Sequence, residues 1–280
     1  MNYYNSYTDK FGLVYSVDMV RIVFKLAFEE NEHIFRHLQH LADYDLDFTV
    51  KHYDRFGVFD YRHLFVIGHR NWESTVTLGF ERSAKPADKP YGMIEWNPNK
   101  VNGADFDDLL RFLKVSCKSM ELKRYDLAID FPCIRSLCRL DMNSLRSYEL
   151  HYENGTYTEY TGVRNAVGRV KLYDKKAESK LAYDLCRVEY TLAYDSDLLD
   201  LQTVLVSEAQ IRLDLNPPSG LLGSYVNLLL EKDAPMRNRA LKDLDYRTRN
   251  KIAPFLQETT LIYDTDCLFK CRDLAFAFTR

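Results

Sequence analysis

The chain has 280 residues, of which 46% are hydrophobic and 28% charged, and its formal net charge is −3. This composition excludes disordered and collagen-like chains, and it supplies enough apolar side chains for one large core or two joined halves. Because proteins that bind DNA through overall charge are usually basic, any nucleic-acid site must be a local patch.

The first 120 residues predict strands around two helices. Apolar alternation predicts a strand within 12–26, and helical spacing predicts helices over 29–44 and 104–120. Strand-like runs lie at 47–53, 56–67, 75–82 and 91–101.

From residue 121 the pattern begins again. "VDMVRI" (17–22) and "YDLAID" (125–130) occupy matching places in the two passages, which indicates an internal duplication. Segment 141–150 fits either a strand or a helix, and a helix is expected over 196–207. The strands expected in this second passage are 123–131, 155–163, 168–176 and 185–193.

After the breaker "NPPSG" (216–220) the pattern becomes helical, over 221–233 and 236–257, and a short tail follows. We therefore expect an α+β fold with a largely antiparallel central sheet. Residues 1–215 are expected to form one domain of two related halves, 1–120 and 121–215, and 216–280 a helical region.

No basic segment followed by an apolar core opens the chain, and no apolar run approaches membrane-spanning length. The sequence thus predicts a soluble, intracellular protein without membrane association. Its cysteines lack the paired CxxC spacing of a zinc site, so they are expected to be reduced, structural thiols. They are Cys117, Cys133, Cys138, Cys186, Cys267 and Cys271.

Three expected strands present unusual polar faces. Period-two alternation puts Asp126 and Asp130 on one face of "RYDLAIDF", and Arg187 and Glu189 on one face of "CRVEYTL". Carboxylates within apolar strands are costly unless they are paired or bind a cation. Asp126, Asp130 and Glu189 therefore suggest a Mg²⁺ or Mn²⁺ site. Salt bridges to Arg187 or Lys171 are the alternative.

The third face belongs to "GRVKLYDKKAESK" (168–180), where Tyr173 stands among Arg169, Lys171 and Lys175. Taken alone, Tyr173 is a surface residue, a stacking platform for bases or a nucleophile. Combined with the carboxylates, the set favours phosphodiester chemistry, in which cations neutralise the phosphate and a phenolate attacks phosphorus.

A basic cluster in the C-terminal region is either a solvated helix face or a DNA contact. Two acidic residues, Asp243 and Asp245, dilute it. The cluster consists of Arg237, Arg239, Lys242, Arg247, Arg249 and Lys251.

These motifs, in this order, resemble the Rep-trans family of rolling-circle plasmid replication initiators and related relaxases. The match rests on "YTGVR" (160–164), "KLYDKKAE" (171–178), "CRVEYTL" (186–192) and the turn "EWNPNK" (95–100), and spans about residues 90–255. "DYRTRNKI" (245–252) loosely echoes a further family motif. The chain has Val163 where serine is common in the family, and Lys171 where arginine is common.

The resemblance implies that Tyr173 nicks one DNA strand at a double-stranded origin, forming a 5′-phosphotyrosine and a free 3′-hydroxyl. It implies a metal held by Asp126, Asp130 and Glu189. The implied phosphate contacts are Lys175, Arg187, Lys171 and Arg164, and Glu178 is a supporting acid.

It also implies a bacterial cytoplasmic homodimer that binds double- and single-stranded DNA and recruits a host helicase, with residues 216–280 binding DNA or dimerising. We expect the metal and the lysines to lower the pKa of Tyr173. Alternatives are a relaxase with the same chemistry, or a non-catalytic DNA-binding protein on the same scaffold.

Overall fold

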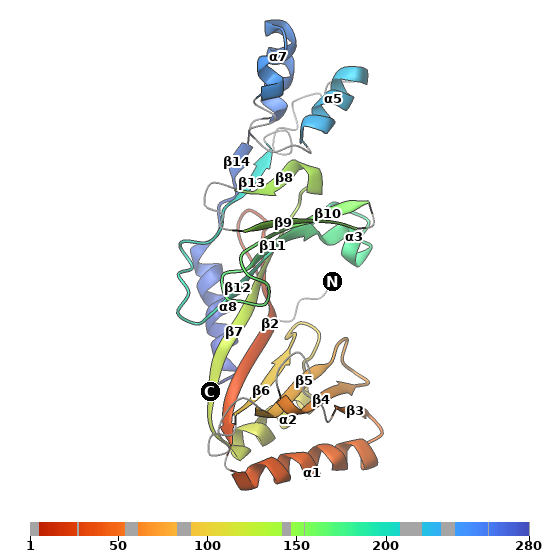
Figure 1. Ribbon diagram of the computed structural model, residues 1–280, viewed down its shortest axis with the longest axis vertical. Helices are drawn as coiled ribbons and strands as arrows, with labels where there is room; N and C mark the ends of the chain where they lie inside the picture. The colour runs from red at the N-terminus through yellow and green to blue at the C-terminus, as the bar shows by residue number, and fades with distance from the viewer. Residues whose placement is uncertain are drawn as a thin grey trace.

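The computed structural model is α+β, as the sequence predicts, and is built around a long antiparallel sheet (Figure 1). The structure describes residues 6–26, 28–53, 61–82, 91–141, 147–153, 155–207, 220–230, 239–256 and 258–279. The strands of the large sheet are β1 (Ser6–Thr8), β2 (Val14–Leu26), β3 (Phe48–Tyr53), β4 (Tyr61–His69), β5 (Val76–Arg82), β6 (Tyr91–Trp96), β7 (Cys117–Phe131), β9 (Tyr148–Glu153), β10 (Thr156–Thr161), β11 (Val170–Asp174) and β12 (Cys186–Leu192).

The strand order shows a repeat. It runs β3-β4-β5-β6-β2-β7-β12-β11-β10-β9, with β1 paired to β2. In each half the first strand, β2 or β7, pairs with the last, β6 or β12. The other large-sheet strands of each half, β3–β5 or β9–β11, form a meander that starts at an edge of the sheet. The two first strands pair with each other at the centre. The strand order is thus what two related halves would produce, and the domain boundary at residue 215 stays a prediction.

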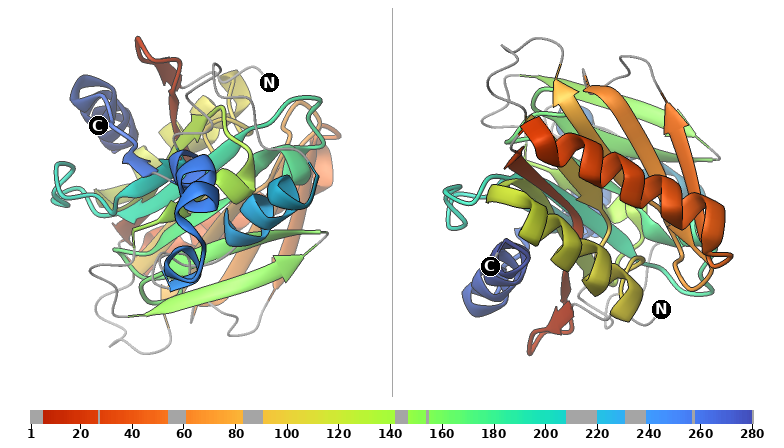
Figure 2. Two further views of the ribbon diagram at one scale, coloured as in Figure 1. Left: turned by 90° about the horizontal axis from the view of Figure 1, so that it is seen from above. Right: turned by 90° about the horizontal axis from the view of Figure 1, so that it is seen from below.

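Helices α1 (Phe28–Tyr44), α2 (Ala104–Ser116) and α8 (Thr265–Ala277) cover one face of this sheet. The structure also contains the helices α3 (Lys175–Ser179), α5 (Gly220–Leu230) and α7 (Tyr246–Ile252), and the 3₁₀ turns η1 (Arg135–Leu137) and η2 (Ala253–Leu256). Figure 2 shows α1 and α2 lying side by side across the first half. Helix α8 packs against β2 and β7.

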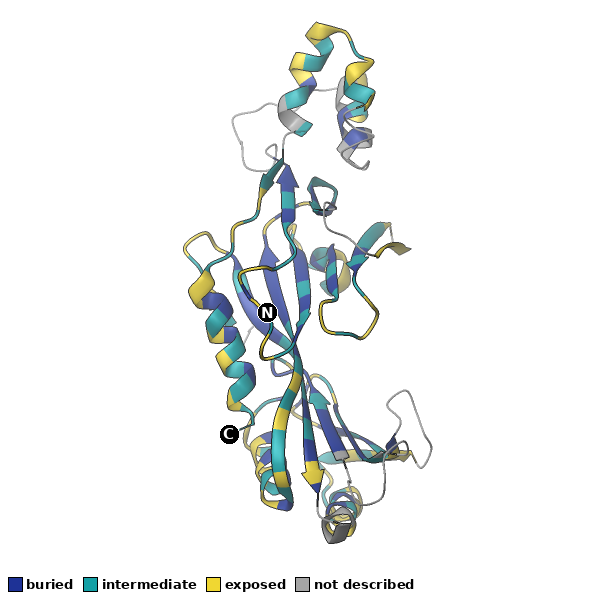
Figure 3. Ribbon diagram, turned by 60° about the vertical axis from the view of Figure 1, so that its left-hand side comes forward, coloured by how far each residue is buried: buried dark blue, intermediate teal, exposed yellow. Residues whose placement is uncertain are grey.

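The core forms where alternate strand residues meet these helices. Tyr125, Leu127 and Ile129 of β7 are fully buried, and α8 adds Leu268 and Cys271 to the same cluster. Figure 3 shows the buried residues concentrated along the central strands. Because side chains alternate across a strand, residues 126, 128 and 130 lie on the opposite face of β7.

A small second sheet corrects one prediction. Instead of a helix over 196–207, the chain turns and then forms β13 (Val204–Ser207) between β14 (Glu258–Thr260) and β8 (Cys138–Leu140). Val204 and Val206 are buried in this sheet. Pairing with distant strands therefore outweighs the helical spacing of the leucines.

Other boundaries also differ from the predictions. The helix expected over 104–120 ends at Ser116, where the chain enters β7, and the segment 141–150 contains the start of β9. Within 236–257 the helix is interrupted: residues 239–242 are helical, and α7 begins at Tyr246, where Asp245 accepts hydrogen bonds from the first turn as an N-cap. The expected short tail contains α8, a core helix.

Helices α5 and α7 form a small cluster of their own around Val226, Leu229 and Ile252, at the opposite end of the long axis from α1 (Figure 1). Among the described residues, no helix is long and apolar enough to cross a membrane.

Candidate active site

The three strands singled out by sequence are neighbours in the sheet, in the order β7-β12-β11. Their cross-strand register places Tyr173 beside Arg187, and Arg187 beside Asp130. The next row on the same face joins Lys171 to Glu189. The predicted residues therefore form two adjacent rows on the face away from α8.

Tyr173 donates its hydroxyl hydrogen to Glu189 Oε1 over 2.6 Å and is only 4% exposed. Lys171 Nζ lies 3.8 Å from the centre of the Tyr173 ring and 3.5 Å from Glu189 Oε2. A hydroxyl nucleophile next to a carboxylate that can accept its proton is an arrangement suited to nucleophilic catalysis.

The pKa of Tyr173 differs from the expectation. Burial, and then the negative charge of Glu189, raise it well above its ordinary value of 10.0 in the metal-free chain. Of the neighbouring cations, Arg187 opposes this increase. The phenol is therefore protonated at neutral pH until Glu189 accepts the proton or a cation offsets its charge.

Arg187 forms a buried ion pair with Asp130. Its Nη2 donates to Asp130 Oδ2 over 2.8 Å, its Nε donates to Oδ1, and its Nη1 lies 3.2 Å from Asp18 Oδ1. Arg187 is 1% exposed and Asp130 3% exposed. Arg187 thus holds Asp130 in place next to Tyr173. The predicted contact between Arg187 and a phosphate would require its buried side chain to become exposed.

Asp18 is a site residue that the sequence reasoning missed. It lies at a register shift between Val17 and Met19, where β2 bulges against β7. The bulge explains the omission, because a bulge re-aims a side chain that strict alternation assigns elsewhere.

The turn "EWNPNK" holds this bulge in place. Asn97 Nδ2 donates to Asp18 Oδ1 over 3.0 Å, and Asn99 Nδ2 donates to the Val17 carbonyl over 2.9 Å. The turn therefore reaches the site through Asp18.

Asp126 lies at the floor of a cavity of about 240 Å³. Burial raises its pKa from 3.8 to about 6, with Glu189 and Asp18 contributing through like charge and Thr191 opposing through a hydrogen bond. Among the described residues, Asp126 Oδ1 is shielded from solvent and has no hydrogen-bond partner. The cavity is lined by Arg124, Asp126, Tyr160, Arg164, Asn165, Arg169, Lys171, Glu189 and Thr191.

One wall of this cavity is the loop between β10 and β11. Gly162 begins it at φ +79°, and a Cβ there would lie 2.7 Å from the Gly168 carbonyl oxygen, so glycine is required. Arg124 Nη1 donates to the Asn165 carbonyl over 2.8 Å and ties the loop to β7. The "YTGVR" segment thus positions Arg164 on the rim.

Lys175 and Glu178, the other predicted pair, lie just after β11 on α3 and contact each other. Lys175 is 5% exposed, with its Nζ 5.8 Å from the Tyr173 ring. Asp174 caps α3 by accepting from the Ala177 amide. The cap fixes Lys175 directly behind the tyrosine.

The basic cluster lies far from this site, on and around α7. Arg239, Lys242, Arg247 and Lys251 are exposed. Arg249 instead donates to the carbonyls of Leu241, Lys242 and Leu244, so it supports the local fold. Arg237 lies outside the described residues.

The residues fit a divalent cation in part. Glu189, like Asp126, has a pKa that is raised, first by burial and then by Asp18, and Lys171 opposes the shift. Asp18, Asp126 and Glu189 repel one another, and one Asp126 oxygen has no partner among the described residues, which favours a hard cation. Within the described residues, however, these carboxylate oxygens do not converge closely enough to hold an ion as they stand. Asp130 does not fit as it stands, because Arg187 engages both its oxygens.

No family model and no curated protein matches the chain. Among solved structures, a rolling circle replication initiator protein from Geobacillus stearothermophilus is 12% identical, with a TM-score of 0.39 over 96% of this chain and 97% of that chain. At this level of similarity, the chemistry of the site must be argued from its own residues.

Proposed function

We propose that the protein nicks one strand of DNA at a specific sequence through Tyr173 and initiates replication from the free 3′-hydroxyl. The observation that carries the proposal is the hydrogen bond from Tyr173 to Glu189, a residue that lines a cavity together with Arg124, Arg164 and Arg169. Cations around a protected nucleophile suit an anionic phosphodiester.

In this mechanism the scissile phosphate enters the cationic cavity. Tyr173 Oη attacks phosphorus while its proton passes to Glu189, 2.6 Å away. The bond to the 3′ oxygen breaks, that oxygen leaves as a hydroxyl after taking a proton from solvent, and the 5′ phosphate stays on Tyr173. Lys171 and Arg164 offset the negative charge that develops on the phosphate.

Asp126 and Glu189 would hold a Mg²⁺ or Mn²⁺ ion, with Asp18 adding negative charge nearby. When bound, the ion would act as a Lewis acid on the phosphate. The chain's own residues supply the nucleophile, the proton acceptor and the cationic rim. Asp130 and Arg187 keep the tyrosine row in place rather than contacting the phosphate.

The test does not require the cognate sequence to be known. The full chain is incubated with Mn²⁺ and single-stranded oligonucleotides that carry a randomised central stretch, and the denatured mixture is separated from unbound DNA. We expect a denaturation-resistant protein–DNA adduct with one enriched sequence. Absence of any adduct, with either Mg²⁺ or Mn²⁺, would contradict the proposal.

One observation favours a second candidate, a non-catalytic DNA-binding protein. The Asp130–Arg187 pair is the structural salt bridge that this alternative expects. It predicts enrichment of bound sequences in native gels, without adducts and without metal dependence. A relaxase of a transferred element has the same chemistry and would give the same adduct.

A further inference from the structure

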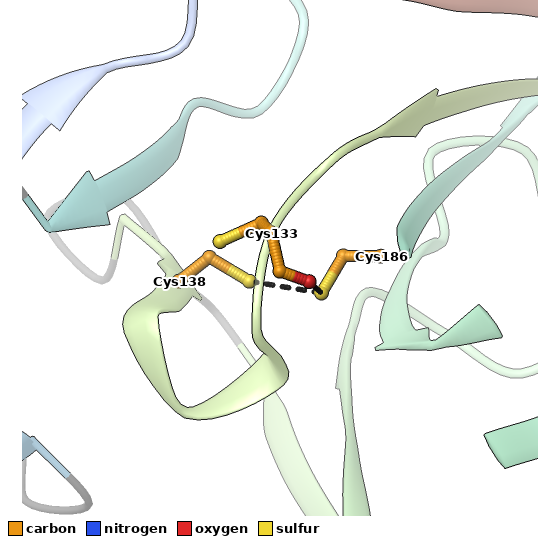
Figure 4. Close-up of side chains that lie close together, drawn as sticks. All are labelled: Cys133, Cys138 and Cys186. Carbon is orange, nitrogen blue, oxygen red and sulfur yellow. Dashed lines mark hydrogen bonds between the residues drawn. The ribbon is translucent and has the colours of Figure 1, made fainter. Parts of the chain in front are cut away.

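A second group of chemically reactive side chains lies behind the candidate active site. The sulfur atoms of Cys133, Cys138 and Cys186 all lie within 4.8 Å of one another, and the three residues are buried. Figure 4 shows them converging from separate segments of the chain: the loop after β7, the start of β8 and the start of β12. Sequence spacing missed the group, because Cys186 is 48 residues beyond Cys138.

We propose that Cys133, Cys138 and Cys186 bind one Zn²⁺ ion. Zinc–thiolate bonds of about 2.3 Å in tetrahedral geometry separate sulfurs by about 3.8 Å. The Cys138 and Cys186 sulfurs are 3.6 Å apart. The cluster therefore needs little movement to close on the ion. Within the described chain no fourth Cys, His, Asp or Glu side chain joins the group, so one position is left open.

The surroundings supply what a thiolate site needs. Arg135 Nη1 lies 3.8 Å from Cys138 Sγ, and Arg135 is buried and paired with Glu159 over 2.6 Å. Its positive charge partly offsets the excess negative charge of three thiolates around a divalent ion, as groups outside the ligand shell do in metal sites. The same guanidinium holds the Cys138 carbonyl over 2.7 Å, which fixes the ligand-bearing turn.

Zinc is ligated by thiolates, so binding would release the thiol protons of the group to solvent.

A cavity of about 550 Å³ adjoins the group at Cys133, and Arg135, Tyr157, Asp174 and Ala177 are among its other lining residues. All three cysteines are buried. We therefore expect the ion to enter from the side of Cys133, and a water molecule to fill the open fourth position.

The ion would tie η1 and β8 to β12. Cys186 immediately precedes Arg187, and Cys133 lies three residues after Asp130. The proposed site would therefore secure the end of the sheet where the Asp130–Arg187 pair lies. It is separate from the magnesium-type site on the other face, and its test does not depend on nicking.

The test measures zinc in the full chain, purified under reductant without chelator and then exposed to excess Zn²⁺ and desalted. We expect one Zn²⁺ per chain by elemental mass spectrometry. Cys138→Ser and Cys186→Ser should each lose most of it. Cys117→Ser and Cys267→Ser, which alter cysteines outside the cluster, should retain it.

A second measurement covers variants that do not fold. The unmodified chain is loaded with Co²⁺ in place of Zn²⁺, and thiolate ligation gives a sulfur-to-cobalt charge-transfer band together with the visible bands of a tetrahedral ion. No bound zinc and no such band, or a Cys138–Cys186 disulfide in the purified chain, would overturn the proposal. Full zinc retention in folded Cys138→Ser and Cys186→Ser would overturn it as well.

Discussion

The two halves of the sheet share a strand order but not a chemistry. In the second half, one row across the strands reads Tyr173, Arg187, Asp130, and all three side chains are polar and buried. This row lies two residues from Glu189 along β12. In the first half, the row that lies two residues from Glu95 along β6 reads Gly79, Met93, Val23. The strand order is therefore repeated, while the proposed nucleophile Tyr173 and the Asp130–Arg187 ion pair are found in the second half.

The connections differ in the same way. After β2 the chain forms α1, a core helix, whereas after β7 it forms a loop with Cys133, then η1, and then β8, which begins at Cys138. Glutamates persist in both halves: Glu95 pairs with Arg21 and Arg124, while Glu189 accepts from Tyr173. A glutamate on the last strand thus serves as a salt-bridge partner in one half and as a proton acceptor in our mechanism in the other.

Removing the proposed nucleophile should have the largest effect. Tyr173→Phe should reduce adduct formation by a factor on the order of 10³ or more, as expected when a covalent catalyst is deleted. Adduct yield on the selected oligonucleotide measures this. Tyr125→Phe is the matched control, since Tyr125 lies on the opposite face of the sheet and its buried hydroxyl has no partner among the described residues. Equal loss in both variants would show a folding defect.

Replacing Arg187 and Asp130 with the residues at the matching first-half positions, Met93 and Val23, should separate the stability effect of the buried charges from that of side-chain packing. Arg187→Met leaves Asp130 buried without its partner and should lower the free energy of unfolding by about 3–5 kcal/mol. Adding Asp130→Val should recover most of that loss, because neither charge is then buried unpaired. Urea unfolding measures both. The idea of a buried, mutually dependent pair fails if the double variant is as unstable as the single one.

Asp126 predicts a pH dependence that can be measured in the absence of divalent metal. Because its pKa rises from 3.8 to about 6 on folding, the folded state binds the extra proton, and its stabilising contribution is present below pH 3.8 and lost as pH rises through about 6. Asp126→Asn should therefore stabilise the chain above pH 7 by on the order of 1–2 kcal/mol relative to the unaltered chain.

The measurement is urea unfolding from pH 4.5 to 8 in chelator, for both chains. Adding Mg²⁺ at pH 7.5 should stabilise the unaltered chain and not Asp126→Asn. A difference between the two that does not vary with pH would show that Asp126 does not carry the expected buried charge.

The smallest effect should come from the loops. Arg164→Ala, on the exposed β10–β11 loop, should weaken DNA binding modestly and reduce the salt dependence of the affinity by about one phosphate contact. Its first-half counterpart, Arg70→Ala in the β4–β5 connection, should leave binding unchanged, because Arg70 pairs with Asp47 over 2.9 Å. Fluorescence anisotropy at several salt concentrations compares the two. Equal salt slopes would place the binding surface elsewhere.

Much of the site was predictable from sequence. Strict alternation assigned Asp126, Asp130, Glu189 and Tyr173 to their faces, because side chains in β-strands alternate. The adjacency of β7, β12 and β11 was only a hypothesis, since sequence periodicity does not define strand partners. The structure confirms it.

The rest depended on contacts distant in sequence. Asp18 was missed because a bulge breaks the alternation, and the cysteine group because Cys186 lies on another strand. The helix over 196–207 was wrong because Val204 and Val206 pair with β8 and β14. The spacing of apolar residues along the chain does not predict which distant strands will pair.

The measurement that tests the account most directly is mass spectrometry of the peptide left on DNA after the adduct is digested with protease. We expect the nucleotide to be attached to the peptide that contains Tyr173, through its phenolic oxygen. Attachment to any other residue, Tyr160 at the cavity included, would contradict the assignment of Tyr173 as the nucleophile.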